Sequence, residues 1–287
     1  MNKYSFKEIL EKEISYGDGD TTVKIDRIEI PKIQRDYAQG RKEGYAIRDR
    51  FLEVIFSTLD IASDARARES ELCMDFVYGS TAGGVFVPLD GQQRLTTLFL
   101  LYWYIGSREL QGMEKDMLMY LLSRFTYETR ISSRQFCKNL VTGDMTCLTF
   151  KDVPGKEIRD SSWFYRSYDQ DPTIKSMLTM LDSIHAKYGK TSNKPLYQRL
   201  EKLKFYILPL DGFGLSDELY VNMNARGKPL TDAENFKADL TNWMKSDDNP
   251  YKNEYHRKVM LDGREMDYYL AFAQKMDANW TSFFWNI

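Results

Sequence analysis

Residues 84–101 read GVFVPLDGQQRLTTLFLL, and this stretch decides the fold. The letters VFVPL predict a strand, DG predicts a turn, and a helix begins at Gln92 and runs to about Arg108. The helix is apolar on nearly every face, so we expect it to be buried at the centre of the protein. A strand that leads directly into a central helix predicts a fold in which helices pack on a sheet.

The same periodicity rules predict further elements on both sides of this stretch. Alternating or β-rich runs predict strands over residues 23–30, 74–80, 85–89, 125–130 and 204–210. Helical spacing predicts helices over residues 5–14, 45–59, 92–108, 132–141, 172–188, 195–202, 217–225, 231–245 and 264–279. The sequence therefore predicts an α+β fold, with a small sheet drawn mostly from the N-terminal half and a larger, mostly helical remainder.

The composition is that of an ordinary globular protein. Its 287 residues carry 40 Lys and Arg against 42 Asp and Glu, which gives a formal net charge of −2. This balance argues against wrapping nucleic acid by bulk electrostatics, so any DNA contact would be regional. The longest apolar segment without charge, residues 95–107, is shorter than the roughly 20 residues that cross a bilayer. We therefore expect no membrane association.

Cysteine and histidine usage argues against several kinds of site. Cys73, Cys137 and Cys147 are odd in number and lack C-x-x-C spacing, which disfavours a disulfide framework and a thiolate zinc site and favours a reducing cytoplasm. The two histidines, His185 and His256, stand apart and belong to no metal-binding motif. Histidine-based or zinc-dependent hydrolysis is therefore not expected.

The first candidate site is the start of the helix at Gln92. A helix N-terminus offers unpaired N–H groups and the positive end of the helix dipole, which together suit an anion. Gly91 lets a ligand approach the backbone, Arg94 adds a planar fork of donors, and Gln92 and Gln93 could orient a phosphate or a water. The alternative is that Asp90 caps the helix and that Gln93 and Arg94 are solvated. The helix that follows is apolar on nearly every face and must be buried, so its polar N-terminus would lie in a pocket. This favours a ligand site.

A second candidate lies in residues 30–41, IPKIQRDYAQGR. The proline predicts an extended connection, in which Gln34, Arg35 and Tyr37 would form a strip that stacks on a base or contacts phosphate. The alternative is a surface loop on which an arginine and a tyrosine pack.

A third candidate lies in residues 217–237, DELYVNMNARGKPLTDAENFK. Gly227 and Pro229 predict the end of one helix, and Thr231 with Glu234 predicts a capping box that begins the next. Asn222 and Arg226 would share one face at the end of the first helix and present an amide and a guanidinium to a ligand. Alternatively, Arg226 and Lys228 only complement the negative end of that helix dipole.

Together, IPKIQRDY, PLDGQQRLTTL and NMNARGKPLTDAENFK resemble the N-terminal domain of GmrSD-type restriction proteins, in the ParB/sulfiredoxin-like superfamily. The resemblance covers roughly residues 25–243. It implies a ParB-like mixed sheet and a domain that binds and hydrolyses nucleoside triphosphates with Mg²⁺, in cytoplasmic anti-phage systems that act on modified DNA.

The resemblance also implies roles for individual residues. A nucleotide and hydrolysis motif would consist of Asp90, Gly91, Gln92, Gln93 and Arg94, in which Asp90 helps to place the metal ion. The same cleft would be lined by Gln34, Arg35, Tyr37, Asn224, Arg226 and Lys228, together with the Asn222 identified above.

Such proteins often carry, or pair with, an HNH-type nuclease domain. His185 and His256 lack the pattern of that metal site, so we do not expect this chain alone to cut DNA. We expect a ParB-like core over residues 1–110, a helical region over 111–245 that returns a strand to the core, and a helical extension over 246–287 that begins a further domain of a longer protein. The sequence leaves open whether the chain forms a homodimer.

Two other functions remain open. The chain could be a non-catalytic module that binds nucleotide or DNA and regulates a separate nuclease domain or subunit. A metal-dependent nuclease centre at Asp232, Glu234 and Lys237 is disfavoured, because these residues adjoin a capping box.

Overall fold

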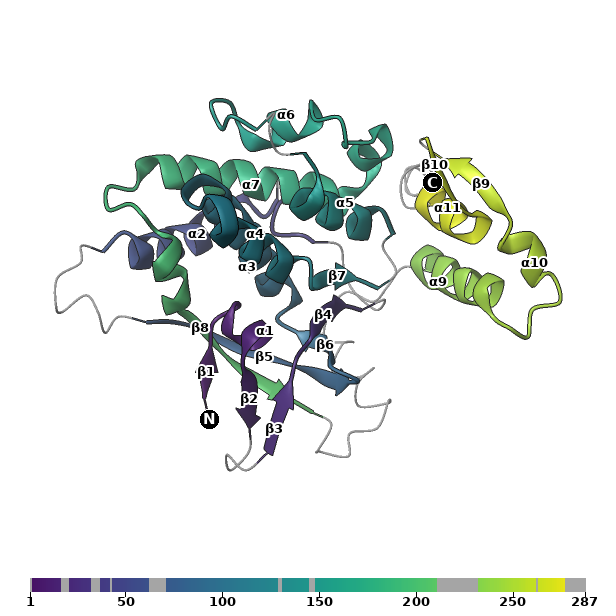
Figure 1. The fold of residues 1–287 in the computed structure, drawn as a ribbon, viewed down its shortest axis with the longest axis horizontal. Helices are drawn as coiled ribbons and strands as arrows, with labels where there is room; N and C mark the ends of the chain where they lie inside the picture. The colour runs from purple at the N-terminus through teal and green to yellow at the C-terminus, as the bar shows by residue number, and fades with distance from the viewer. Residues whose placement is uncertain are drawn as a thin grey trace.

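The computed structural model describes residues 2–16, 21–31, 37–41, 43–61, 71–128, 131–144, 148–210, 232–261 and 263–276. Helices lie over a six-stranded mixed sheet, and a smaller unit of helices and a hairpin lies beside them (Figure 1). This arrangement confirms the predicted α+β fold, with its sheet built mostly from the N-terminal half. Among the described helices, none has the length and the apolar character that a membrane span requires.

The main sheet has the strand order β1-β8-β5-β6-β4-β7. Its strands are β1 (Lys3–Tyr4), β4 (Arg27–Ile30), β5 (Leu72–Ala82), β6 (Val85–Asp90), β7 (Phe125–Tyr127) and β8 (Leu203–Pro209). β8 runs parallel to β5 and antiparallel to β1, while β4 runs parallel to both β6 and β7. β8, the last strand of this sheet along the chain, therefore lies between β1 and β5.

β5 and β6 form the predicted hairpin. Its turn contains Gly83 and Gly84, which have φ values of 54° and 78°, a region that glycine enters without steric cost. β5 also contains an irregularity, because its register with β8 shifts between Cys73 and Phe76, and Asp75 within it has a φ of 66°. Such a bulge bends the strand and redirects its backbone groups.

α3 (Gln92–Glu109) is the central helix, and every residue from Leu95 to Gly106 is buried. It packs against α7 (Pro172–Lys190) and α4 (Gly112–Leu122). The remaining helices of the body are α2 (Tyr45–Leu59), α5 (Ile131–Thr142), α6 (Pro154–Arg159) and the 3₁₀ helices η2 (Arg166–Gln170) and η3 (Tyr197–Lys202). The helices predicted over 45–59, 92–108, 132–141 and 172–188 are confirmed, whereas the periodicity rules missed α4 and α6.

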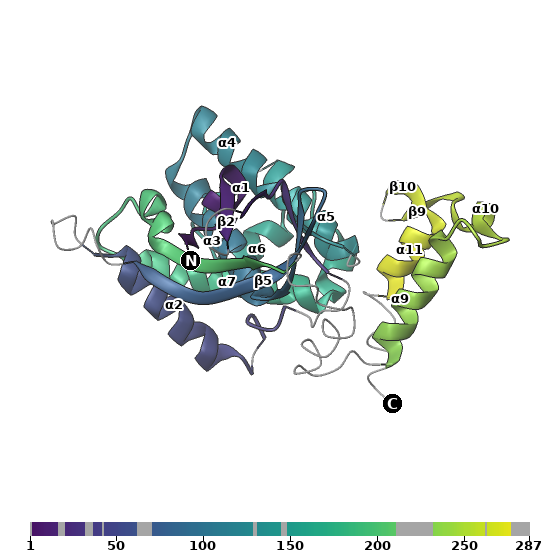
Figure 2. The same ribbon diagram turned by 90° about the horizontal axis from the view of Figure 1, so that it is seen from below.

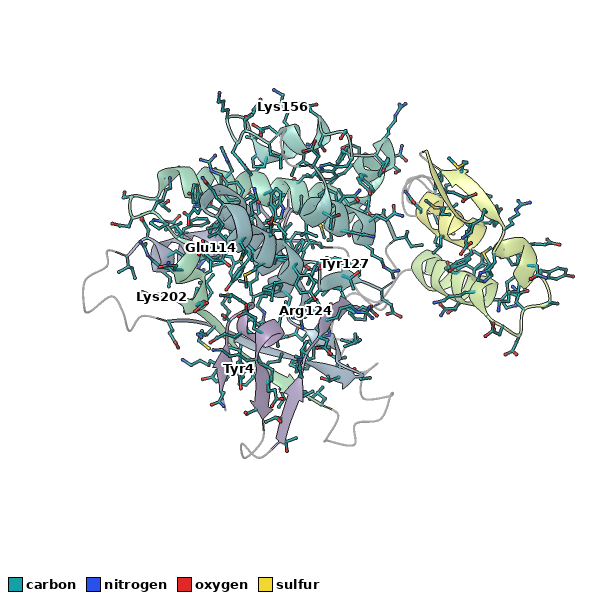
Figure 3. The ribbon with its side chains drawn as sticks, in the orientation of Figure 1. Tyr4, Glu114, Arg124, Tyr127, Lys156 and Lys202 are labelled. Carbon is teal, nitrogen blue, oxygen red and sulfur yellow. The ribbon has the colours of Figure 1, made fainter. Side chains whose placement is uncertain are left out.

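The N-terminal region differs from the sequence prediction. Only Glu8–Glu11 form a helix (α1), and β2 (Glu13–Tyr16) follows and pairs with β3 (Thr21–Lys24), so the strand predicted over 23–30 is split. At the split, the guanidinium of Arg124, a residue labelled in Figure 3, donates to the main-chain oxygens of Leu10, Ile25 and Asp26 and so holds the chain between β3 and β4.

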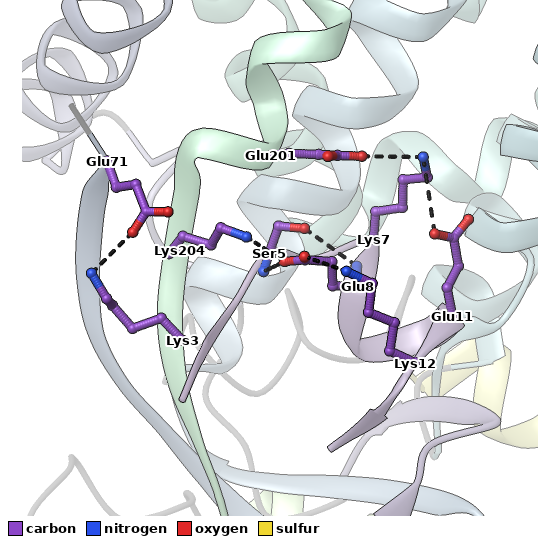
Figure 4. A network of polar contacts seen from close by, with 9 residues as sticks. All are labelled: Lys3, Ser5, Lys7, Glu8, Glu11, Lys12, Glu71, Glu201 and Lys204. Carbon is purple, nitrogen blue, oxygen red and sulfur yellow. Dashed lines mark hydrogen bonds and ion pairs between the residues drawn. The ribbon is translucent and has the colours of Figure 1, made fainter. Parts of the chain in front are cut away.

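A cluster of charged side chains fixes β1 and α1 to β8 (Figure 4). Burial alone would raise the pKa of the Glu8 carboxyl, but hydrogen bonds from Lys12, Lys204 and the Ser5 N–H outweigh burial and lower that pKa to about 2. Glu8 therefore stays ionised at neutral pH and joins the first helix to the returning strand.

The smaller unit contains α9 (Asp232–Lys245), α10 (Lys252–Tyr255), β9 (Lys258–Leu261), β10 (Arg264–Asp267) and α11 (Tyr268–Lys275), and Figure 2 shows it beside α5. A continuous helix from residue 264 is a wrong prediction. Gly263, with a φ of 78°, allows a tight turn, and β10 then pairs with β9 before α11 begins. In α11, Gln274 donates to the hydroxyl oxygen of Ser167 at 3.3 Å and so links this unit to the body.

Candidate functional site

The turn before α3 is pressed against β5. Gly91 has a φ of 86° and a ψ of 2°, the left-handed region that favours glycine, and a Cβ atom there would lie 2.6 Å from Cγ2 of Val77. Gly91 is also the residue that precedes the first turn of the helix, and its carbonyl accepts from the Leu95 N–H at 2.9 Å. Glycine is therefore required at this position both by backbone conformation and by space.

No side chain among the described residues caps α3. Asp90 does not act as the N-cap, because that position belongs to Gly91, and the Asp90 side chain is 59% exposed. The alternative in which Asp90 caps the helix is therefore wrong. The positive end of the α3 dipole has no carboxylate or hydroxyl cap from the described part of the chain, which is the condition that an anion site requires.

Both glutamines of the first turn contact the protein backbone. The side-chain amide of Gln92 donates to the carbonyl oxygen of Pro88 at 2.7 Å. The side-chain oxygen of Gln93 accepts from the Ala38 N–H at 2.9 Å. Each glutamine is partly buried, so Gln93 is not the solvated residue of the alternative interpretation. These bonds fix the orientation of both amides at the start of the helix.

Arg94 faces β5 and not bulk solvent. Its side chain is 20% exposed, and its guanidinium donates to the Met74 carbonyl oxygen and, at 2.6 Å, to that of Phe76. The Asp90 carboxylate lies 3.3 Å from the same group. Met74 and Phe76 flank the β5 bulge, whose irregular backbone presents both carbonyls to one planar fork of donors. In this arrangement Arg94 ties the first turn of α3 to β5.

Part of the second predicted stretch lies against α3. The hydroxyl of Tyr37 lies 2.7 Å from Oγ1 of Thr97, and the side-chain oxygen of Gln39 lies 2.6 Å from the same Oγ1 atom. Thr97 is one turn beyond Gln93, whose carbonyl oxygen it also contacts at 2.9 Å. Residues 37–41 therefore run along the first two turns of the helix that follows the DGQQR motif.

Tyr37 itself is 1% exposed. Burial raises the pKa of its phenol, which stays neutral and can donate a hydrogen bond to Thr97. Because the ring is buried in the core, it does not fit the base-stacking role predicted for Tyr37. Sequence reasoning missed Gln39 and Thr97, although the spacing of four residues between Gln93 and Thr97 places both on one face of α3.

The remaining predicted ligands are Gln34, Arg35, Asn222, Asn224, Arg226 and Lys228, and they lie outside the described residues, as does the helix predicted over 217–225. They stay predictions. The strand that leads to the third stretch is described, however. β8 ends beside β5, where Pro209 is opposite Gly79 and the Leu210 N–H donates to the Gly79 carbonyl oxygen at 2.8 Å. In the same hairpin Tyr78 is opposite Asp90, so β8 ends close to the turn before α3.

Among the described residues, no group of three or more His, Cys, Asp and Glu side chains could hold a metal ion. Asp90 supplies one exposed carboxylate at the mouth of α3. Mg²⁺ commonly takes one or two protein carboxylates and completes its coordination with phosphate oxygens and water. The donor set therefore suits Mg²⁺ that arrives with a nucleotide, and it does not suit an ion held by the protein alone.

Comparison with known proteins agrees with the resemblance seen in the three stretches. The family model for the GmrSD restriction endonuclease, N-terminal domain, matches residues 11–241. No curated protein and no solved structure matches the chain. The matched residues include all three signature stretches, the whole of α3, and every strand of the main sheet except β1. This chain belongs to the GmrSD restriction endonuclease N-terminal domain family.

Proposed function

We propose that this chain binds a nucleoside triphosphate at the N-terminus of α3 and hydrolyses it within a GmrSD-like restriction system that acts on modified DNA. One observation carries the proposal: α3 is a buried helix that begins after a left-handed glycine, without a side-chain cap among the described residues. Its first-turn N–H groups and its dipole favour a bound phosphate group.

The residues of the motif would then have separate roles. The first-turn N–H groups that follow Gly91 would bind a phosphate, and one of the two oriented amides, Gln92 or Gln93, would position the attacking water. Arg94 holds the first turn against β5 and can reach a phosphate only if it exchanges its bonds to the β5 carbonyls. The six predicted ligands outside the described residues would complete the contacts to the nucleotide.

Asp90 would hold Mg²⁺ together with the phosphate oxygens. When bound, the ion supplies charge neutralisation on the phosphate groups. The exposed Asp90 carboxylate would provide the protein part of this site.

One observation favours a second candidate function, a non-catalytic module that binds nucleotide or DNA and regulates a nuclease domain or subunit. The Arg94 guanidinium and the Gln93 side-chain oxygen are already occupied by backbone groups. A site whose polar side chains are used to position segments is suited to sensing a ligand as well as to chemistry. An HNH-type nuclease, modified DNA and a second copy of the chain are the partners proposed for it.

The test is phosphate release from purified protein with each common nucleoside triphosphate, with and without Mg²⁺, combined with titration calorimetry. The variant Asp90→Asn alters an exposed residue of the site, and Asp116→Asn, an exposed residue of α4, is its matched control. Turnover that falls in Asp90→Asn but not in Asp116→Asn supports hydrolysis. Saturable binding without turnover supports a module that senses nucleotide. Absence of both nucleotide binding and turnover overturns hydrolysis and nucleotide sensing.

A further inference from the structure

A buried arginine outside the signature motifs holds the segment that runs along α3. Arg48, in the first turn of α2, is 5% exposed. One terminal nitrogen of its guanidinium donates to the main-chain oxygens of Gln39 and Arg41, at 2.9 and 3.0 Å. Its Nε donates to the hydroxyl of Ser183 in α7 at 3.0 Å. One side chain thus joins α2, the segment 37–41 and α7.

The same segment is fixed from its other side. Tyr37, Ala38 and Gln39 contact α3 through the hydroxyl of Thr97 and the side-chain oxygen of Gln93. A Cβ atom on Gly40 would lie 1.9 Å from the Ser176 carbonyl oxygen, so the backbone of the segment also touches α7. Contacts with α3, with α7 and with the Arg48 guanidinium therefore hold this segment in one position.

The charge of Arg48 is also unusual. Among the described residues, no carboxylate lies within ion-pair distance of it, and its partners there are neutral oxygens and the ring of Tyr45, whose centroid lies 5.5 Å from Cζ of Arg48. A buried cation without a counter-charge is costly, and such groups are retained where their charge or their geometry is used. Here the Arg48 guanidinium contacts the main chain of Gln39, whose side chain reaches Thr97 in the second turn of α3.

We propose that Arg48 is the positioning residue of the α3 site: its guanidinium holds residues 37–41 across the helix, so that the Ala38 N–H orients the side chain of Gln93 at the first turn of α3. The inference rests on the proposed nucleotide site. The part of it that concerns the position of residues 37–41 can be tested without a nucleotide. Lysine at position 48 keeps the charge and loses the planar fork, so that it cannot serve Gln39, Arg41 and Ser183 with the same geometry.

Arg124 provides a matched control. Like Arg48, it donates to main-chain oxygens through its guanidinium, and its side chain is partly buried. Its partners, however, are Leu10, Ile25 and Asp26, which lie outside the site. Arg48→Lys and Arg124→Lys should therefore both lower the melting temperature. Only Arg48→Lys should loosen residues 37–41.

The experiment combines hydrogen exchange of the full chain with nucleotide titration. For Arg48→Lys we expect amide exchange in residues 37–41 to accelerate at least about tenfold, and the dissociation constant of the nucleotide bound by the wild type to rise about tenfold or more. Arg124→Lys should change neither quantity. Gly40→Ala, which pushes the segment off α7 and leaves Arg48 in place, should reproduce both effects.

Each outcome decides a different point. Unchanged exchange in Arg48→Lys overturns the inference whether or not nucleotide binds. Faster exchange with unchanged affinity overturns the link to the ligand. A wild-type protein that binds no nucleotide overturns the proposed function, and the exchange data still decide whether Arg48 holds the segment. If Arg48→Lys fails to fold, Ser183→Ala removes the Nε partner, together with the bond from the Ser183 hydroxyl to the Thr179 carbonyl oxygen within α7, and should give a smaller acceleration in residues 37–41.

Discussion

The phenol oxygen of Tyr37 lies 2.7 Å from the hydroxyl oxygen of Thr97, in the interior of the protein. This contact joins two of the stretches that carry the family resemblance. Because both groups are buried, loss of either hydroxyl leaves the other with fewer partners. Tyr37→Phe should lower the free energy of unfolding by about 1 kcal/mol, as measured by urea denaturation.

The cycle Tyr37→Phe, Thr97→Val and the double variant tests whether the two hydroxyls act together. We expect a coupling free energy of about 0.5 to 1 kcal/mol. Strict additivity of the two single effects would show that the hydroxyls do not interact.

Gly91→Ala should destabilise the protein by about 2 to 4 kcal/mol, because it adds a left-handed alanine and an overpacked contact with Val77. Thermal or urea unfolding measures the loss. The double variant Gly91→Ala with Val77→Ala relieves only the contact, so it should be more stable than expected from the sum of the single changes. If Val77→Ala gives no such relief, the turn is not pressed against β5.

Arg94→Lys should loosen the connection between α3 and β5. Lysine cannot bridge the Met74 and Phe76 carbonyls as a planar fork does, and the expected loss of stability is about 1 to 3 kcal/mol. Faster amide exchange at residues 73–77 should accompany it. Asp90→Asn removes only an exposed partner and should leave that exchange unchanged. Equal exchange in Arg94→Lys and the wild type would contradict the bridging role.

The Glu8 cluster predicts how stability depends on pH. The pKa of Glu8 is about 2 in the folded protein, against an ordinary value of 4.5, so its ionised form stabilises the fold at neutral pH. This contribution is fully present above the unfolded pKa and is lost as the pH falls from about 4.5 towards 2. Glu8→Gln should therefore lower stability by about 2 kcal/mol at pH 7, and the difference from the wild type should shrink across that range.

Glu11→Gln is the matched control for Glu8→Gln, because Glu11 lies on the same helix and its ion pair within the described part of the chain is a long one, 3.9 Å from Lys7. Its stability should follow the wild type at every pH. A difference between Glu8→Gln and the wild type that is as large at pH 2.5 as at pH 7 would mean that packing, and not the charge, stabilises this corner.

Much of the fold was predictable because the relevant signals are local. The VFVPL strand, the DG turn and the apolar helix after them follow from periodicity over a few residues, and all three are confirmed as β6, the turn at Gly91 and α3. The prediction fails over residues 5–14, over 23–30 and over the described part, 264–276, of the helix predicted for 264–279. In each case a strand pairing or a tie such as that of Arg124 overrides the local pattern.

The site was predictable only in part, for the same reason. The sequence indicated that Arg94 stands at a helix start, but its nearest acceptors come from the β5 bulge, 18 and 20 residues earlier in the chain. It indicated that Tyr37 belongs to a strip that stacks on a base or contacts phosphate, but the ring is buried and its hydroxyl contacts Thr97. Arg48 escaped notice, because a single arginine on an amphipathic helix looks like any solvated residue until its burial is known.

The sequence by itself determined the family, the central helix and the glycine that precedes it, since these depend on motif letters and on backbone preferences within one turn. The tertiary structure alone decided what the polar side chains do there. Packing brought residues 37–41, α2, α7 and β5 around the start of α3. A side chain's partner depends on which distant segments pack beside it, and no window of sequence contains that information.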